Sequence, residues 1–333
     1  MLKNNKLKII AEAGVNHNGI MKNALNLVDI AKKSGADFVK FQYFRPNLLS
    51  TRLAKQANYQ KITYRQKNNS HFKMLENLKL SINQLKIISK YCKKKKIKFL
   101  LSVFDHESIK DLKNFKMEYL KIPSGEITNL PLLQKISKLN YKIILSTGMS
   151  NLNEIRAALK ILKDKKIILL HCNTDYPTAL KDVNLNAMVK MQKIFKCEIG
   201  YSDHTNGFET GISAVALGAK FIEKHFTLNK NLKGPDHKAS LSPKELNYFI
   251  KYLRNTTVLL GKDLKKITSA EKKNIKIIRK SLYAKKTILK GEKFTENNII
   301  PKRPANGLSP MFWNKVIGKK AKRNFFLDDK IKI

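Results

Sequence analysis

Eight short apolar runs, separated by amphipathic segments of helical period, constrain the fold of this chain more than any other feature of its sequence. A buried strand that alternates with a helix is typical of the βα units of a parallel sheet, and eight such strands close a barrel. The sequence therefore predicts an α/β fold, a (β/α)8 TIM barrel. The expected strands are residues 8–14, 37–42, 97–104, 118–125, 142–148, 166–172, 197–203 and 220–226.

The pattern divides the chain into three parts. Residues 1–261 carry the barrel repeat, whose last helix starts at the Ser-Pro pair 242–243, with the serine as N-cap. Residues 262–275 are expected to form a linker. Residues 276–333 contain short β-like pieces and predict a small β-rich domain. Within the barrel, residues 45–80 are polar and have no clear period, which predicts an extended loop over one end.

Polar side chains follow the predicted strands at the points where the strands end. In a barrel of this kind the active site lies at the carboxyl ends of the strands, so these are the candidate functional residues. Their occurrence on every strand favours an enzyme. They are Glu12, Lys40, Gln42, Ser102, Lys121, Ser124, Ser146, Thr147, His171, Ser202, His204, Glu223 and His225.

Two of these residues are lysines inside otherwise apolar strands. Burying an ammonium group is costly unless it meets an anion. Lys40 and Lys121 therefore predict a bound phosphate or carboxylate, aided by the strand-end serines and the backbone N–H groups of nearby glycine turns. The alternative is a buried salt bridge from each lysine to Glu12 or Glu126. No Gly-rich nucleotide loop is present, so neither ATP nor NAD is expected.

Two histidines lie at the ends of the last two predicted strands. If these strands are neighbours, His204 and His225 emerge at the same edge, near the carboxylates of Asp203, Glu223 and Asp236. Such a group could hold a divalent metal ion. Structural histidines that only form hydrogen bonds are the alternative.

The formal charge of +42 raises the possibility of nucleic-acid binding. The lysines, however, are spread over nearly every polar segment and do not form one stripe interleaved with aromatic residues. The charge therefore favours attraction of anionic small molecules over a specific nucleic-acid partner.

Cysteine usage and hydropathy indicate the compartment. The three cysteines, Cys92, Cys172 and Cys197, are widely spaced without a C-x-x-C pair, so we expect reduced and mostly structural thiols. No apolar run reaches the ~18 residues of a membrane span, and the first residues have too short an apolar stretch for a signal peptide. A cytoplasmic protein is the expectation.

Motifs along the whole chain resemble those of the sialic acid synthase family, which includes N-acetylneuraminate synthase and the bacterial legionaminate and pseudaminate synthases. The resemblance implies a TIM barrel followed by a small antifreeze-like (SAF) domain. It also implies condensation of phosphoenolpyruvate with an N-acylated amino sugar to a nine-carbon 2-keto acid, with release of phosphate. The motifs are AEAGVNHNG, ADFVKFQ, KIPSGEITNLP, ILSTGMS, HCNTDYPT, GYSDHT, IEKHFTLNKNLKGPDH and KRPANGLSP.

The resemblance further implies roles for individual residues. His204 and His225, rather than His237, would bind a catalytic Mn²⁺ or Mg²⁺. Glu12 and Gln42 would lie near the sugar and the metal-bound water, and either Glu12 or Glu223 would act as the base for water. Phosphoenolpyruvate or the sugar would contact Lys40, Ser102, Lys121, Ser124, Ser146, Thr174, Tyr176, Ser202 and Asp236.

The C-terminal motif implies an assembly. Arg303 resembles an arginine that the SAF domain places in the active site of the neighbouring subunit, in a domain-swapped homodimer. Two positions depart from the family pattern. Residues 101–104 read LSVF where S-T-P-F is usual, although Ser102 keeps a hydroxyl, and Thr174 replaces an asparagine of some members.

These observations rank the possible functions. N-acetylneuraminate synthase, acting on N-acetylmannosamine, is the first expectation. The alternative is N,N'-diacetyllegionaminate synthase, which uses a 2,4-diacetamido-6-deoxy sugar, with residues 45–80 expected to line the part of the pocket that distinguishes the two. A basic nucleic-acid-binding protein and a sugar-binding protein without turnover on the same barrel are more distant alternatives.

Overall fold

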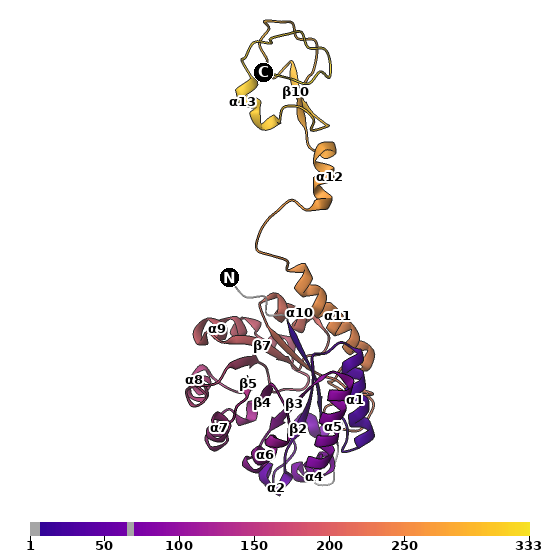
Figure 1. Ribbon diagram of the computed structural model, residues 1–333, viewed down its shortest axis with the longest axis vertical. Coiled ribbons are helices and arrows are strands. Elements are labelled where there is room, and N and C mark those ends of the chain that lie inside the picture. Colours follow the sequence, from indigo (N-terminus) through magenta and orange to yellow (C-terminus); the bar gives the residue numbers. More distant parts are fainter. Residues whose placement is uncertain (1–6, 65–69) are drawn as a thin grey trace. The chain divides into compact units, whose positions relative to one another are not determined.

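Eight parallel strands form a closed barrel in the order of the sequence (Figure 1). The computed structural model describes residues 7–64 and 70–333, and the chain divides into two compact units, Met1–Gly261 and Lys262–Ile333. The barrel belongs to the first unit and confirms the predicted (β/α)8 fold. Its strands are β1 (Lys8–Gly14), β2 (Phe38–Tyr43), β3 (Lys98–Val103), β4 (Tyr119–Ile122), β5 (Lys142–Ser146), β6 (Ile167–His171), β7 (Glu198–Asp203) and β8 (Phe221–His225).

Helices surround the barrel, because each buries an apolar stripe against the strands (Figure 1). The last of them starts as predicted, with Ser242 as N-cap accepting a hydrogen bond from Glu245 N. The helices are α1 (Met21–Lys33), α5 (Ile82–Lys95), α6 (His106–Asp111), α7 (Leu130–Ser137), α8 (Leu152–Ile161), α9 (Leu185–Phe195), α10 (Glu209–Ala216) and α11 (Pro243–Leu259), with 3-10 turns η2 (Leu112–Asn114), η3 (Ser124–Glu126) and η4 (Leu180–Asp182). In the described part of the chain, no helix has the length and apolar character that a membrane span requires.

An apolar plug fills the interior of the barrel below its carboxyl-end mouth. Side chains alternate along a strand, so the residue two positions after a plug residue faces the same interior. This spacing carries Glu12, Lys40, Ser102, Lys121, Ser146 and Glu223 into the mouth. The plug consists of Ile10, Phe38, Leu100, Tyr119, Ile144, Ile168, Leu170 and Phe221.

Strand β7 contributes a glycine to the plug layer. A Cβ at Gly200 would lie 2.5 Å from Leu170 Cδ2 and 2.5 Å from the carbonyl oxygen of Phe221. The large side chains of the neighbouring strands fill this space, so glycine is the residue that allows the barrel to close here.

The prediction of an extended loop at residues 45–80 is wrong. The insert contains three helices, α2 (Pro46–Leu49), α3 (Asn58–Thr63) and α4 (His71–Leu78), while residues 65–69 of this predicted loop lie outside the described residues. Helix α4 buries Met74, Leu75 and Leu78 in a separate apolar cluster. A helix of about two turns contains too few residues for its period to be recognised in the sequence, which explains the error.

The second unit contains two short antiparallel strands around its own apolar core. The strands β9 (Ser281–Ala284) and β10 (Ile299–Lys302) pair with each other, and the core includes Leu282, Phe294 and Phe325. Part of the predicted linker is helical, because α12 covers residues 269–278. The remaining elements of this unit are η5 (Pro310–Phe312) and α13 (Trp313–Val316).

Candidate active site

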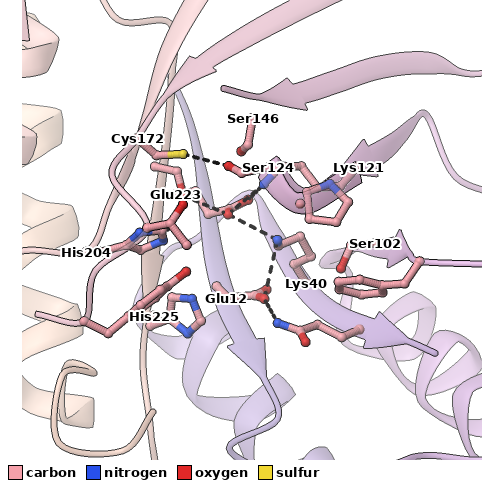
Figure 2. Close-up of a pocket in the computed structure, with 17 residues that line it drawn as sticks. Glu12, Lys40, Ser102, Lys121, Ser124, Ser146, Cys172, His204, Glu223 and His225 are labelled. Atoms are coloured by element: carbon pink, nitrogen blue, oxygen red, sulfur yellow. Dashed lines mark hydrogen bonds and ion pairs between the residues drawn. The ribbon is translucent and has the colours of Figure 1, made fainter. Parts of the chain in front are cut away.

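The mouth of the barrel contains a cavity of about 150 Å³ that opens to solvent. All residues to which the resemblance assigns a role line it except Asp236 and Arg303, so strands far apart in the sequence bring these side chains together. Figure 2 shows many of them pointing toward one another. The lining residues are Glu12, Lys40, Gln42, Ser102, Phe104, Lys121, Pro123, Ser124, Gly125, Ser146, Cys172, Thr174, Tyr176, Ser202, His204, Glu223 and His225.

A buried cluster of four charges crosses the cavity (Figure 2). Lys40 Nζ lies 3.4 Å from Glu12 Oε1 and 3.1 Å from Glu223 Oε1. Lys121 Nζ donates to both oxygens of Glu223, at 2.9 and 3.2 Å. All four side chains are at most 4% exposed. The predicted alternative of salt bridges is therefore right for Lys40 and Glu12, but Lys121 pairs with Glu223 and not with Glu126.

The two carboxylates differ in how strongly the lysines hold them. Burial would raise the pKa of Glu223, but the Lys121 and Lys40 ammonium groups outweigh it and hold that pKa far below the ordinary value. Burial raises the pKa of Glu12, against the opposing effect of Lys40. One oxygen of Glu12, Oε2, is buried without a hydrogen-bond partner, so this carboxylate keeps an unused acceptor.

His204 presents a free lone pair to the cavity. Its Nδ1 lies 2.6 Å from the carbonyl oxygen of Asn173, and a carbonyl only accepts, so Nδ1 carries the hydrogen. Its Nε2 faces Ser202 Oγ at 3.3 Å, but that hydroxyl donates its hydrogen to Glu223 at 3.0 Å. Burial lowers the pKa of His204 to about 4, so the ring is neutral at pH 7.

His225 lies beside His204, with 5.5 Å between the ring centroids. Burial and the neighbouring imidazole of His204 lower its pKa well below the ordinary value, and its Nδ1 has no hydrogen-bond partner. Two neutral imidazoles with unused nitrogens suit a divalent metal ion, and the carbonyl of Asn173 orients one of them. In residues 7–64 and 70–333, no group of three or more His, Cys, Asp or Glu side chains is arranged to hold a metal ion, so two histidines are the protein ligands on offer here.

An aromatic stack covers the histidines. Tyr176 lies parallel to His204 at 4.2 Å between ring centroids, and Tyr59 of helix α3 packs on Tyr176 at 5.0 Å. Asp236 is buried, with Oδ2 3.9 Å from His225 Nδ1. Burial and the charge of Glu12 raise the pKa of Asp236 to about 7. The polar insert thus contributes Tyr59 next to the cavity, a residue that no sequence pattern indicated.

Two histidines and one threonine considered in the sequence lie away from the cavity. His237 is engaged on both ring nitrogens, with Thr227 Oγ1 at 2.6 Å and Asn18 Oδ1 at 3.0 Å. His171 Nε2 contacts the carbonyl of Val183, and the Thr147 hydroxyl donates to that of Leu170. These strand-end side chains therefore serve the fold.

Cys172 is a lining residue that the sequence reasoning missed. All three cysteines are free thiols, as expected, but Cys172 faces the cavity and its sulfur lies 3.1 Å from Ser124 Oγ. That hydroxyl also accepts a hydrogen bond from Gly148 N at 3.0 Å. The alternation rule could have identified Cys172, because it follows the plug residue Leu170 by two positions.

Arg303 belongs to the second unit. It is exposed and directly follows strand β10. Its predicted role depends on a partner subunit and stays a prediction.

Models of one protein family and one domain match the chain. The NeuB family matches residues 27–265 and the SAF domain matches residues 279–329. The N,N'-diacetyllegionaminic acid synthase of Campylobacter jejuni is 50% identical, covering 98% of this chain and 99% of the relative. That of Legionella pneumophila is 38% identical, covering 95% and 90%. A crystal structure of the N-acetylneuraminic acid (sialic acid) synthetase of Leptospira borgpetersenii in complex with citrate is 32% identical, with a TM-score of 0.71, covering 82% of this chain and 91% of that chain.

Replacing Glu223 by Gln tests the charge cluster. The substitution leaves the buried Lys121 ammonium without its carboxylate, so we expect the free energy of unfolding to fall by about 3 kcal/mol. Added inorganic phosphate should raise the stability of this variant more than that of the wild type, since the cavity becomes more positive. Urea unfolding followed by far-UV circular dichroism measures both effects.

The matched control is Glu126→Gln. Glu126 is a buried carboxylate that accepts a hydrogen bond from the Asn129 amide, and burial raises its pKa. We expect this change to be nearly neutral. Equal losses in the two variants would contradict a special role of the lysine pairs. Trp313, the single tryptophan of the sequence, lies in the second unit, so its fluorescence serves as an internal reference.

Proposed function

The chain belongs to the NeuB family, and from this premise we propose that it condenses phosphoenolpyruvate with a 2,4-diacetamido-6-deoxy sugar to form N,N'-diacetyllegionaminate. One observation carries the choice of sugar. The chain is 50% identical to a legionaminic acid synthase over nearly its whole length, but 32% identical to the sialic acid synthetase of known structure. N-acetylneuraminate synthesis, the first expectation from the sequence, becomes the second candidate.

Phosphoenolpyruvate binds between the two interior lysines. Its phosphate and carboxylate meet the ammonium groups of Lys40 and Lys121, which are buried, so that the attraction is stronger than between the same charges in bulk water. The hydroxyl groups of the strand-end serines supply hydrogen bonds to the same anion. These hydroxyls belong to Ser102, Ser124, Ser146 and Ser202, all of which line the cavity.

His204, through Nε2, and His225 would hold a divalent metal ion, Mn²⁺ or Mg²⁺. The charge count supports this proposal, because two lysines and two glutamates leave the cavity neutral, and a bound anion then needs a compensating cation. The ion supplies Lewis-acid polarisation of the aldehyde of the open-chain sugar.

Carbon–carbon bond formation joins C3 of phosphoenolpyruvate to that aldehyde carbon. Positive charge then develops at C2, water adds there, and phosphate leaves with cleavage of the C–O bond. Glu12 is the better placed base for the water, with Gln42 donating to its Oε1 at 3.1 Å and its Oε2 unused. Both lysines contact Glu223, which is therefore a structural counter-ion rather than the base.

The sugar lies at the outer end of the cavity. Tyr176, Asp236 and Thr174 contact it, with Tyr176 stacked on His204. Tyr59 packs on Tyr176 from the insert. This contact supports a role of α3 in distinguishing a 6-deoxy diacetamido sugar from N-acetylmannosamine.

Phosphate release distinguishes the two sugars. With phosphoenolpyruvate and a divalent metal ion, we expect kcat/KM at least about 100-fold higher for the 2,4-diacetamido-6-deoxy sugar than for N-acetylmannosamine, a difference that pocket contacts can supply. The reverse preference would make the chain an N-acetylneuraminate synthase. Release with neither sugar, together with salt-sensitive DNA binding, would favour the nucleic-acid alternative.

Metal removal tests the histidine site. Treatment with EDTA should abolish turnover, and added Mn²⁺ or Mg²⁺ should restore it in the wild type but not in His225→Ala. A change at a histidine outside the cavity, His71→Ala, controls for loss of an imidazole alone. Full turnover in EDTA would refute metal dependence.

Arg303 completes the site of a partner subunit in a domain-swapped homodimer. We expect Arg303→Ala to be inactive, and mixing it with inactive His225→Ala to restore up to about a quarter of the wild-type activity, as random pairing of subunits would give. Arg323→Ala, a change at another half-exposed arginine of the same unit, should stay active. If the two variants exchange subunits and the mixture stays inactive, the domain-swapped homodimer is excluded.

A further inference from the structure

A buried ion pair lies on the outer side of the barrel, directly behind the two cavity histidines. Successive residues of a strand face opposite sides. Ser202 and His204 of one segment, and Glu223 and His225 of the other, face the cavity, so the residues between them face outward. These are Asp203 and Lys224, which are register partners on β7 and β8.

Lys224 and Asp203 close a ring of contacts around His204. Lys224 Nζ lies 2.8 Å from Asp203 Oδ2 as an ion pair and donates its hydrogen bond to the carbonyl of Thr205 at 2.7 Å. Asp203 Oδ1 accepts from both the N–H and the hydroxyl of Thr205, at 2.9 and 2.7 Å. The residues on both sides of His204 are therefore held by the same ammonium group.

These contacts around His204 are buried and extend to two helices. The Asp203 and Lys224 side chains are at most 1% exposed. The Thr205 hydroxyl oxygen, whose own hydrogen goes to Asp203, accepts a hydrogen bond from the Thr210 hydroxyl of α10 at 3.0 Å. The Lys224 ammonium lies 5.7 Å from the ring centroid of Phe249 in α11. An isolated buried ion pair adds little to stability compared with apolar residues, but its short, directional contacts orient the backbone that makes them.

We infer that Asp203 and Lys224 are positioning residues that fix the direction of the His204 ring. The contacts of Asp203 and Lys224 with Thr205 hold the backbone on both sides of His204. In this position its Nδ1 reaches the Asn173 carbonyl and its Nε2 faces the cavity. The consequence for metal binding rests on the proposed function, whereas the orientation of His204 does not.

The main test uses the double variant Lys224→Met/Asp203→Asn, which removes both charges and leaves no buried ion unpaired. Lys224→Gln/Asp203→Asn, which also removes both charges but keeps hydrogen-bonding groups at both positions, is the milder variant should the first double variant not fold. The control is Arg254→Met/Asp37→Asn, which removes the ion pair between Arg254 and Asp37 at 2.7 Å. Asp37 accepts from Ile9 N, so this pair lies at the amino ends of β1 and β2, at the opposite end of the strands from the cavity.

Histidine side-chain NMR of the metal-free protein gives the deciding measurement. In wild type, His204 should show a protected Nδ1–H signal, assigned by its loss in His204→Gln. We expect this signal to be lost or to exchange at least tenfold faster in the double variant, and to persist in the control. Its persistence at the wild-type exchange rate in the folded double variant would overturn the inference.

Binding of Mn²⁺, followed by electron paramagnetic resonance, separates this inference from the proposed function. We expect the Kd for Mn²⁺ to rise at least tenfold in the double variant and to stay within twofold of wild type in the control. A wild-type protein that binds no Mn²⁺ would refute the metal part of the proposed function, and the NMR signal would still decide whether the pair orients His204.

Discussion

The pairing of Glu223 with two interior lysines is the interaction on which the site depends. Lys40 and Lys121 enter the barrel from strands β2 and β4, and Glu223 of β8 contacts both. Isolated ammonium groups at this depth would cost several kcal/mol each. Because two carboxylates lie opposite two ammonium groups, the net charge of this cluster is zero. The barrel can therefore bury two lysines, which are available to the proposed anionic substrate, without a large loss of stability.

Strand alternation gives the last two strands two separate tasks. On the cavity side they present Ser202, His204, Glu223 and His225, and on the outer side they present Asp203 and Lys224. The cavity residues are arranged for chemistry and the outer pair for orientation. Placing both on consecutive residues couples them through one short stretch of backbone, so a contact outside the barrel affects an imidazole inside it.

The insert between β2 and β3 connects the fold with substrate choice. Its helix α4 has an apolar cluster of its own, and this anchors the segment from which Tyr59 of α3 reaches Tyr176. The reaction proposed for this chain would use the lysines and histidines of the strands, whereas the choice among amino sugars is expected to depend on such peripheral residues.

The sequence by itself determined the eight strands, and through their alternation most of the residues that face the cavity, because both follow from local patterns of apolar residues. Only the tertiary structure decided which charges meet. Glu223 rather than Glu126 pairs with Lys121, Tyr59 reaches the site from the insert, and Asp203 meets Lys224 behind the histidines. These pairings depend on the register and closure of the barrel, which bring together residues from about twenty to more than a hundred positions apart. No local pattern contains that information.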